Sequence, residues 1–472
     1  MSKVYRDFLE LCAFDEEEIE KLLPEWIEGS KILGLEEEDV AYALNEWIPQ
    51  NWDIQYLGVR KMIGAHIREA IEISKLNQYK KDGVKIVYGI LPAISTCYLG
   101  LKNAGKDKIF VNFPDLLLVT ILNGFFHKVD SYLERAEEDG MTYGCRHCAL
   151  NKTRIGAKAS GVIPSPDVIW TWGLNCDEGP KTDEYIAGLY GKDWKYVISR
   201  IPHDTHFGNI DDEDEERVKY LARVLKEGQE EIENIIGIKV SDEDMKKAIA
   251  DQGRYVFKYS QLVSLACKSN PQVVSGSVLS NFGNLLGVPF NSGFEYMEEA
   301  LDIMLRECKK AAKEGVGILP KDAPKLACYF VPFAVPWVDR IFMENGIGIT
   351  FCLTFTPSKS QLKPPNYEDS FMVIAESWLQ MSFGQNMGYE IQGFCEKVEA
   401  MKPFDGLLLG FFDFDRWLGA HHKIASKVIE ERTGVPTFYM ESDFWEDRDY
   451  SPEALRTRIE SVAQVIKLKK ES

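Results

Sequence analysis

Eight short apolar segments, arranged as two groups of four, limit the folds that this chain can adopt. The segments are rich in β-branched and aromatic residues and alternate with sequence of helical periodicity, which predicts βαβ units on parallel sheets. The block between the two groups is rich in Glu, Lys and Leu and contains no strand-like segment. The predicted strands are 85–91, 108–114, 167–174 and 194–202 in the first group, and 325–331, 348–355, 406–412 and 436–440 in the second.

This order predicts an α/β protein with two doubly wound parallel-sheet lobes, a helical domain and an N-terminal helical extension. We expect the extension at 1–80, the first lobe at 81–209, the helical domain at 210–322 and the second lobe at 323–472. A chain of 472 residues is long enough for two or three domains of roughly 100–200 residues each.

The third strand, its helix and the fourth strand look alike in the two groups. Cys176 follows the third strand of the first group, and Asp415 follows the third strand of the second. Open α/β sheets bind ligands at the carboxyl ends of their strands. We therefore expect Cys176 and Asp415 to occupy equivalent loops that face each other across a cleft.

The formal net charge of -19 argues against nucleic acid and anionic membrane surfaces as partners, because both attract Lys and Arg. It leaves room for an anionic small ligand in a local basic pocket. The N-terminus has no apolar signal core, and no stretch approaches the roughly 20 apolar residues of a membrane span. We expect a cytoplasmic protein, whose ten cysteines are reduced thiols or metal ligands.

The most informative cysteines are Cys145 and Cys148, which form a C-x-x-C pair, together with Cys176. Thiolates are soft ligands suited to iron–sulfur clusters and zinc. Ordinary buried thiols and a thioredoxin-like dithiol at Cys145 and Cys148 are the alternatives. The other cysteines are expected to pack in strands or helices, with a minor candidate at Cys97; they are Cys12, Cys97, Cys267, Cys308, Cys328, Cys352 and Cys395.

Several charged and imidazole side chains are weaker candidates. His147 is either a ligand or a plain surface residue, and we favour the second interpretation. We interpret His203 and His206 as structural despite their metal-like spacing. Lys152 and Arg154, after Cys148, are interpreted either as cations near a cluster or a CoA phosphate, or as members of a surface salt bridge. Adjacent helical positions point apart, so one histidine of the pair His421 and His422 is expected to be solvated.

Familiar motifs for other chemistries are missing from the sequence. It contains no Walker phosphate loop, no Gly-rich dinucleotide fingerprint that opens a helix after a strand, and no G-x-S-x-G nucleophile elbow. Binding of ATP or NAD through a standard motif is therefore not expected.

From about Lys85 to the C-terminus the chain resembles the family of 2-hydroxyacyl-CoA dehydratase subunits and class I benzoyl-CoA reductase iron–sulfur subunits. The order and spacing of several segments carry this resemblance. They are Cys148-Ala-Leu-Asn-Lys152-Thr-Arg-Ile-Gly156, Pro166-Asp-Val-Ile-Trp up to Cys176, Ile201-Pro-His203, Ile236-Gly-Ile-Lys-Val-Ser-Asp-Glu-Asp, and the tail from Gly434-Val-Pro-Thr-Phe-Tyr-Met to Ser451.

The resemblance implies two related α/β lobes with a helical domain, and a [4Fe–4S] cluster held by three cysteines in the cleft. It also implies a heterodimer with a homologous second subunit, an acyl-CoA substrate, and a separate ATP-dependent activator that delivers one electron at low potential. The dehydratases, which are lyases, form a ketyl radical from a 2-hydroxyacyl thioester and expel hydroxide. The reductases, which are oxidoreductases of anaerobic metabolism, reduce an aromatic ring, and some relatives use a double-cubane cluster to reduce small molecules.

Two of the three family ligands, Cys148 and Cys176, carry over to this sequence, but the third position holds Asp415. A carboxylate is a harder ligand than a thiolate and would shift the reduction potential of a cluster. Cys145 or a water is the alternative third ligand. The departure leaves open a modified cluster, a non-catalytic structural partner subunit, and a zinc or thiol-redox protein that uses Cys145 and Cys148.

Overall fold

The computed structural model describes residues 2–90, 95–141, 147–173, 178–200, 214–284, 288–329, 334–353, 356–357, 362–380, 387–410, 416–441, 445–448 and 451–471. Within these residues lie two four-stranded sheets whose strand pairs are all parallel. The first contains β1 (Lys85–Gly89), β2 (Ile109–Asn112), β3 (Val168–Gly173) and β4 (Tyr196–Arg200). The second contains β5 (Lys325–Cys328), β6 (Gly348–Cys352), β7 (Gly406–Leu409) and β8 (Thr437–Tyr439). The α/β fold class and its eight predicted strands are thus confirmed.

The two sheets have the same strand order, β2-β1-β3-β4 and β6-β5-β7-β8. In each, the chain moves outward from the first strand to the second and then returns to add the third and fourth on the other side. The order therefore reverses between β1 and β3 in one sheet and between β5 and β7 in the other. Such switch points are where open α/β sheets bind ligands, beyond the carboxyl ends of the strands.

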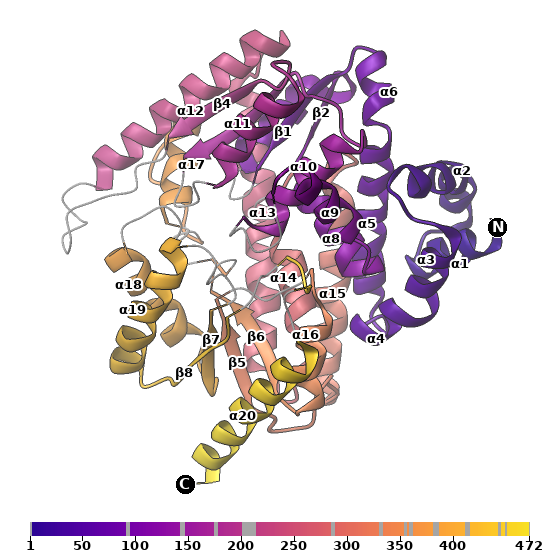
Figure 1. The fold of residues 1–472 in the computed structure, drawn as a ribbon. Coiled ribbons are helices and arrows are strands. Elements are labelled where there is room, and N and C mark those ends of the chain that lie inside the picture. Colours follow the sequence, from indigo (N-terminus) through magenta and orange to yellow (C-terminus); the bar gives the residue numbers. More distant parts are fainter. Residues whose placement is uncertain are drawn as a thin grey trace.

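Helices that follow the strands of the first sheet pack around it (Figure 1). The 13 residues of α8 are all buried, and α10 packs against both α8 and α9. These helices are α7 (Ser95–Gly105), the short 3-10 helix η2 (Lys106–Lys108), α8 (Pro114–Phe126), α9 (Asp130–Glu138), α10 (Ala149–Ala159) and α11 (Glu178–Tyr190).

The described chain between the two sheets is mostly helical and contains no strand. It forms α12 (Asp214–Ile236), α13 (Asp242–Lys268), α14 (Gly276–Asn284) and α15 (Phe294–Glu314). These helices also cover the sheets, since α12 packs on β3 and β4 while α13 contacts both α7 and β6. They connect the two lobes, and the domain boundaries given above stay a prediction.

Residues 2–81 are mostly helical, as expected, and pack closely against the first lobe. They form α1 (Ser2–Leu11), α2 (Glu16–Ile32), α3 (Glu37–Tyr42), the π-helix η1 (Ala43–Trp47), α4 (Ile48–Asn51), α5 (Leu57–Ser74) and α6 (Leu76–Lys81). Phe8 stacks on Phe126 of α8, 5.3 Å between ring centroids, and Trp26 packs against the same ring at a tilt, 6.0 Å away. The indole nitrogens of Trp47 and Trp52 both donate to the carbonyl oxygen of Gly124, at 3.0 and 2.9 Å.

The helices of this second half are α16 (Trp337–Glu344), α17 (Ser370–Leu379), α18 (Met387–Met401), α19 (Arg416–Thr433) and α20 (Pro452–Glu471). Of these, α16 packs on β6 and α19 packs on β8 and α18, whereas α17 lies against α12 and α13 (Figure 1). In Figure 1, α20 extends away from the lobe toward the C-terminus. None of the helices in the described ranges combines the length and the apolar character that a membrane crossing requires.

Candidate functional site

Cys148 stands at the start of α10, where it is the N-cap residue with extended backbone angles. Its side chain is 7% exposed and accepts a hydrogen bond from the Asn151 amide nitrogen, 3.2 Å from Sγ. The first turn of a helix carries partial positive charge from unpaired backbone N–H groups. This position therefore favours a negatively charged sulfur, which is the form that binds metals.

Close packing against α9 fixes the position of α10. A Cβ atom built on Gly156 would lie 1.9 Å from the carbonyl oxygen of Tyr132. Only glycine allows the two backbones to approach this closely. The helix that begins at Cys148 is therefore held against α9 through its own backbone.

The first turn of α11 is joined to the start of α10. The backbone N–H of Cys148 donates to Glu178 Oε2 at 2.9 Å, and His147 Nε2 lies 2.9 Å from Thr182 Oγ1. Thr182 in turn donates to the carbonyl oxygen of Glu178 at 2.7 Å. Glu178 follows Cys176 by two residues in the sequence. These contacts therefore place the start of α11, the helix after Cys176, next to Cys148. His147 is 14% exposed and paired, so its interpretation as a plain surface residue was wrong.

Arg154 lies inside the protein, where it joins α8, α10 and α11. Its guanidinium contacts Asp115 Oδ2 at 3.4 Å, Asp183 Oδ1 at 3.7 Å and the carbonyl oxygen of Gly179 at 3.0 Å. The side chains of the arginine and both aspartates are 0% exposed. Burial raises the pKa of Asp115 and of Asp183, the latter to about 6, and the Arg154 charge opposes the rise in both. The alternative of a surface salt bridge is therefore wrong for Arg154.

Lys152 is also buried, with 3% of its side chain exposed, and lies 3.5 Å from Glu137 Oε1 on α9. The same carboxylate accepts from Arg448 of the second lobe at 2.8 Å. Partial burial would raise the pKa of Glu137, but the hydrogen bonds and charges of Arg448 and Lys152 outweigh it and lower that pKa. The surface salt bridge is thus wrong for Lys152 too, and α10 is connected to the second lobe through Glu137.

The other predicted ligands, Cys145, Cys176 and Asp415, lie outside the described residues, as do His203 and His206. The structure therefore leaves untested whether these residues come together with Cys148. Among the residues it describes, no group of three or more His, Cys, Asp or Glu is arranged to hold a metal ion. The cysteines expected to pack are buried and free of disulfides, and they include Cys97 on α7; they are Cys12, Cys97, Cys267, Cys308, Cys328, Cys352 and Cys395.

The prediction that one of the two adjacent histidines of α19 is solvated was wrong, because both are buried. The ring of His422 packs edge-on against Tyr329, 4.3 Å between centroids, and that of His421 contacts Phe394 at 5.8 Å. The two histidines share one buried face of the helix with Ala425 and Ile429, while Ile424 on the other face is exposed. Burial lowers the pKa of His421 to about 4 and that of His422 to about 3.

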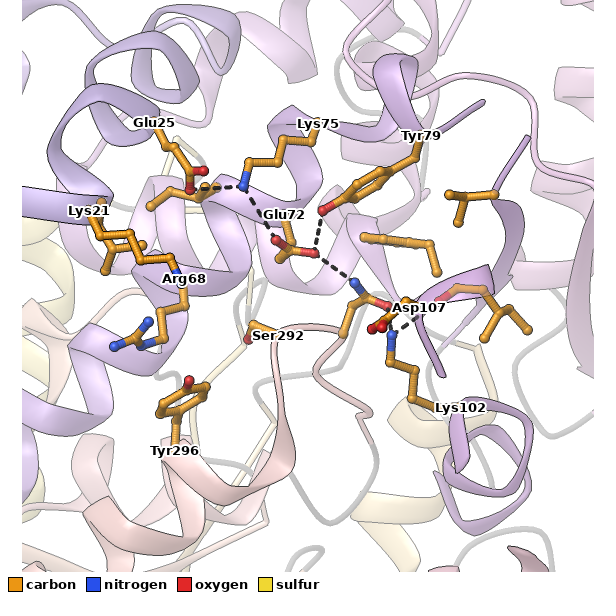
Figure 2. Close-up of a pocket in the computed structure, with 16 residues that line it drawn as sticks. Lys21, Glu25, Arg68, Glu72, Lys75, Tyr79, Lys102, Asp107, Ser292 and Tyr296 are labelled. Atoms are coloured by element: carbon orange, nitrogen blue, oxygen red, sulfur yellow. Dashed lines mark hydrogen bonds and ion pairs between the residues drawn. The ribbon is translucent and has the colours of Figure 1, made fainter. Parts of the chain in front are cut away.

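A polar pocket of about 440 Å³ lies elsewhere, between the extension and the beginning of the first sheet (Figure 2). Val84 and Ile109 line it at the amino ends of β1 and β2, whereas Cys176 follows the carboxyl end of β3. Its charges largely satisfy one another: Lys75 lies 2.9 Å from Glu25 and 3.7 Å from Glu72. We interpret it as the interface that joins the extension to the sheet edge.

Sequence reasoning missed Asn151, Glu178, Asp115 and Asp183. Asn151 lies one helical turn after Cys148, so the predicted helix already placed the two on one face. Glu178 is close in sequence to Cys176 and stands at a helix start, so the sequence could have indicated this residue as well. The two aspartates come from separate helices, and nothing in the sequence pairs them with Arg154.

Comparison with known proteins gives two matches. A family model described as 2-hydroxyglutaryl-CoA dehydratase, D-component, matches residues 115–466. Over 190 residues the chain is 27% identical to the (R)-2-hydroxyisocaproyl-CoA dehydratase alpha subunit of Clostridioides difficile. That alignment covers 39% of this chain and 43% of the relative, so the chain spans less than half of the curated relative that it matches. The range matched by the family model includes Cys145, Cys148, Cys176 and Asp415.

Proposed function

The chain belongs to the 2-hydroxyglutaryl-CoA dehydratase D-component family, and from this premise we propose that it is the iron–sulfur subunit of a 2-hydroxyacyl-CoA dehydratase. It would act as part of a lyase, on an acyl-CoA thioester, together with a homologous second subunit and an ATP-dependent activator. A reductase of the benzoyl-CoA type, which uses the same low-potential single-electron chemistry, is the alternative. The placement of Cys148 at the start of α10, against the helix that follows Cys176, is the observation that supports this proposal most directly.

The residues near Cys148 suit a [4Fe–4S] cluster in their chemistry. Cys148 offers a soft sulfur ligand at the positive end of an 11-residue helix, and Asn151 directs an amide hydrogen at that sulfur. We propose Cys148 and Cys176 as two ligands, with Asp415 or Cys145 as the third. When bound, the cluster would supply the low-potential single electron that a 2-hydroxyacyl thioester needs in order to lose hydroxide.

The residues of this chain would contribute position and shielding. Glu178 and His147 hold the two loops together through α11, while Arg154 and Gly156 fix α10 against its neighbours. Burial of Cys148 would limit the access of water and oxygen to its sulfur. A low-potential centre depends on such a shell.

The test is the iron and acid-labile sulfide content of anaerobically purified protein. We expect the wild-type chain and a Cys308→Ala control, which alters a buried thiol on α15, to contain iron and sulfide. Cys148→Ser and Cys176→Ser should each lose most of both. Full iron content in Cys176→Ser would contradict the proposal.

The same assay identifies the third ligand. If Asp415 ligates iron, Asp415→Asn should lose iron or shift the reduction potential, whereas an Asp415 that only caps the next helix should tolerate Asn. Loss of iron from Cys145→Ser together with an unchanged Asp415→Asn would assign the third position to Cys145.

A second candidate function is that of a non-catalytic structural subunit in the same kind of complex. The aspartate at position 415, where the family has its third cysteine, favours it. This candidate predicts a wild-type chain without iron that still binds its partner subunit. A chain that contains zinc but no sulfide would instead support a zinc or thiol-redox protein using Cys145 and Cys148.

A further inference from the structure

The side-chain amide of Asn151 lies between two groups with opposite hydrogen-bonding needs. On one side its nitrogen is 3.2 Å from Cys148 Sγ, and on the other its oxygen is 3.3 Å from a guanidinium nitrogen of Arg154. Asn151 is 3% exposed, so water competes little for either contact. Residues 148, 151 and 154 follow one another at intervals of three on one face of the helix.

The chemistry of Arg154 determines which way this amide points. A guanidinium has only donors, so the group that faces it must be the amide oxygen. The amide NH₂ then faces the sulfur and can only donate to it. The orientation of Asn151 is therefore fixed by its neighbour, even though oxygen and nitrogen look alike in shape.

Arg154 itself is held from three directions. Asp115 comes from α8, Asp183 and Gly179 from α11, and all three contact the same buried guanidinium. Two carboxylates face the single positive charge of Arg154. The group that faces the sulfur is thus the neutral N–H dipole of Asn151, and the buried ion cluster around Arg154 fixes its orientation.

We propose that Asn151 donates an N–H···S hydrogen bond to the cluster-ligating sulfur of Cys148 and thereby raises the reduction potential of the cluster, with Arg154 as the residue that positions it. The inference rests on the proposed function. Reduction adds negative charge to the cluster and its sulfurs, and an N–H donor stabilises the reduced form more than the oxidised form. Removing the donor should therefore make the potential more negative.

The experiment is an anaerobic redox titration of the purified chain, followed by electron paramagnetic resonance and visible absorbance, with iron counted in every sample. Asn151→Leu removes the donor and keeps the branched shape of the side chain, and Asn151→Ala is the second variant in case the larger leucine folds poorly. Thr153→Val is the matched control, because Thr153 is equally buried on α10 but donates to its own helix, to Ala149 O at 2.8 Å.

We expect iron-loaded Asn151→Leu and Asn151→Ala to have a more negative midpoint potential, while Thr153→Val keeps that of the wild type. An unchanged potential in an iron-loaded Asn151 variant would overturn the inference, as would an equal shift in Thr153→Val. Loss of iron from both Asn151 variants would also overturn it, because Asn151 would then serve to hold Cys148 in place. A wild-type chain without iron would instead overturn the proposed function, on which the inference rests.

Discussion

Arg154 is a fully buried cation that faces two fully buried carboxylates. The cluster therefore has more negative than positive groups, and this charge imbalance affects the stability of the fold. Removing charged groups from water is costly, and a buried ion pair often does no more than offset that cost. With two aspartates and one guanidinium, one carboxylate is always less well compensated. The raised pKa values of Asp115 and Asp183 follow from this desolvation, which Arg154 only partly opposes.

A first prediction concerns the pH dependence that Asp183 gives to folding. Burial raises the pKa of Asp183 to about 6 in the folded protein, compared with about 3.9 in an unfolded chain. Its contribution to stability is therefore fully present below about pH 3.9 and is lost as the pH rises through about 6. A shift of this size corresponds to roughly 3 kcal/mol. Asp183→Asn removes the titration, so the variant should gain stability relative to the wild type between pH 4.5 and pH 7.5.

Urea unfolding of both proteins at these two pH values measures the effect. The control is Asp107→Asn, at an exposed position between α7 and β2. Its unfolding midpoint should follow the wild type at both pH values. If the free energy of unfolding changed equally for Asp183→Asn and the wild type between the two pH values, Asp183 would not titrate in this range.

At the scale of elements, the local sequence was sufficient where local rules decide the structure. The core strands β1 and β2 are short apolar runs that are buried almost throughout, which is the pattern of a parallel sheet covered on both faces. The sequence was insufficient where another element decides. Nothing in the α19 sequence indicates that its buried face is wide enough to include both His421 and His422, so the expectation of a solvated histidine was wrong. The same holds for the candidate site. The sequence predicted Cys148 and the helix after it, but not the buried partners of Arg154.

A second prediction concerns the packing of α10 on α9. Gly156→Ala places a methyl group 1.9 Å from the carbonyl oxygen of Tyr132, so one helix must move. Overpacking of this kind costs about 1–3 kcal/mol or more. Because Cys148 begins the same helix, we expect a lower melting temperature and a reduced iron content.

The matched control is Gly188→Ala in α11, where an added Cβ meets no atom within 4 Å. Alanine is the better helix former by roughly 0.5–1 kcal/mol, so this variant should be as stable as the wild type or more so. Equal melting temperatures for Gly156→Ala and the wild type would mean that α9 and α10 adjust without cost.

At the scale of the whole molecule, a short segment near the C-terminus joins the second lobe to the first lobe. Asp447 accepts hydrogen bonds from His127 of the first lobe at 2.9 Å and from Trp337 of α16 at 2.8 Å. The His127 ring also stacks on Trp47 of the extension, 4.2 Å between centroids. These residues are up to 400 positions apart, so no sequence periodicity relates them, and only the assembled fold brings them together.

The last prediction concerns the pH dependence of this connection. Burial would lower the pKa of His127, but its hydrogen bond to Asp447 and the charges of Asp447 and Asp130 together raise it above the ordinary value. Partial burial would raise the pKa of Asp447, but its hydrogen bond to His127 and the charge of that ring lower it. The stabilisation from charged His127 is thus fully present below about pH 6.5 and is lost as the pH rises through the raised value, while Asp447 keeps its charge down to below about pH 3.9. Arg448 and Glu134 also act electrostatically on Asp130, which belongs to the same cluster.

A double-mutant cycle with His127→Asn and Asp447→Asn, measured by urea unfolding, isolates the pair. Asparagine suits position 127 because the backbone there is left-handed, with φ +55°, and asparagine adopts that conformation readily without being able to take up a proton. His127 is 40% exposed, so solvent screens the pair and the coupling should be at most about 1 kcal/mol. We expect a favourable coupling at pH 5.5 that is clearly smaller at pH 8.5. A coupling that is equal at the two pH values would mean that the neutral hydrogen bond alone holds the lobes together at this point, and that proton uptake by His127 adds nothing to it.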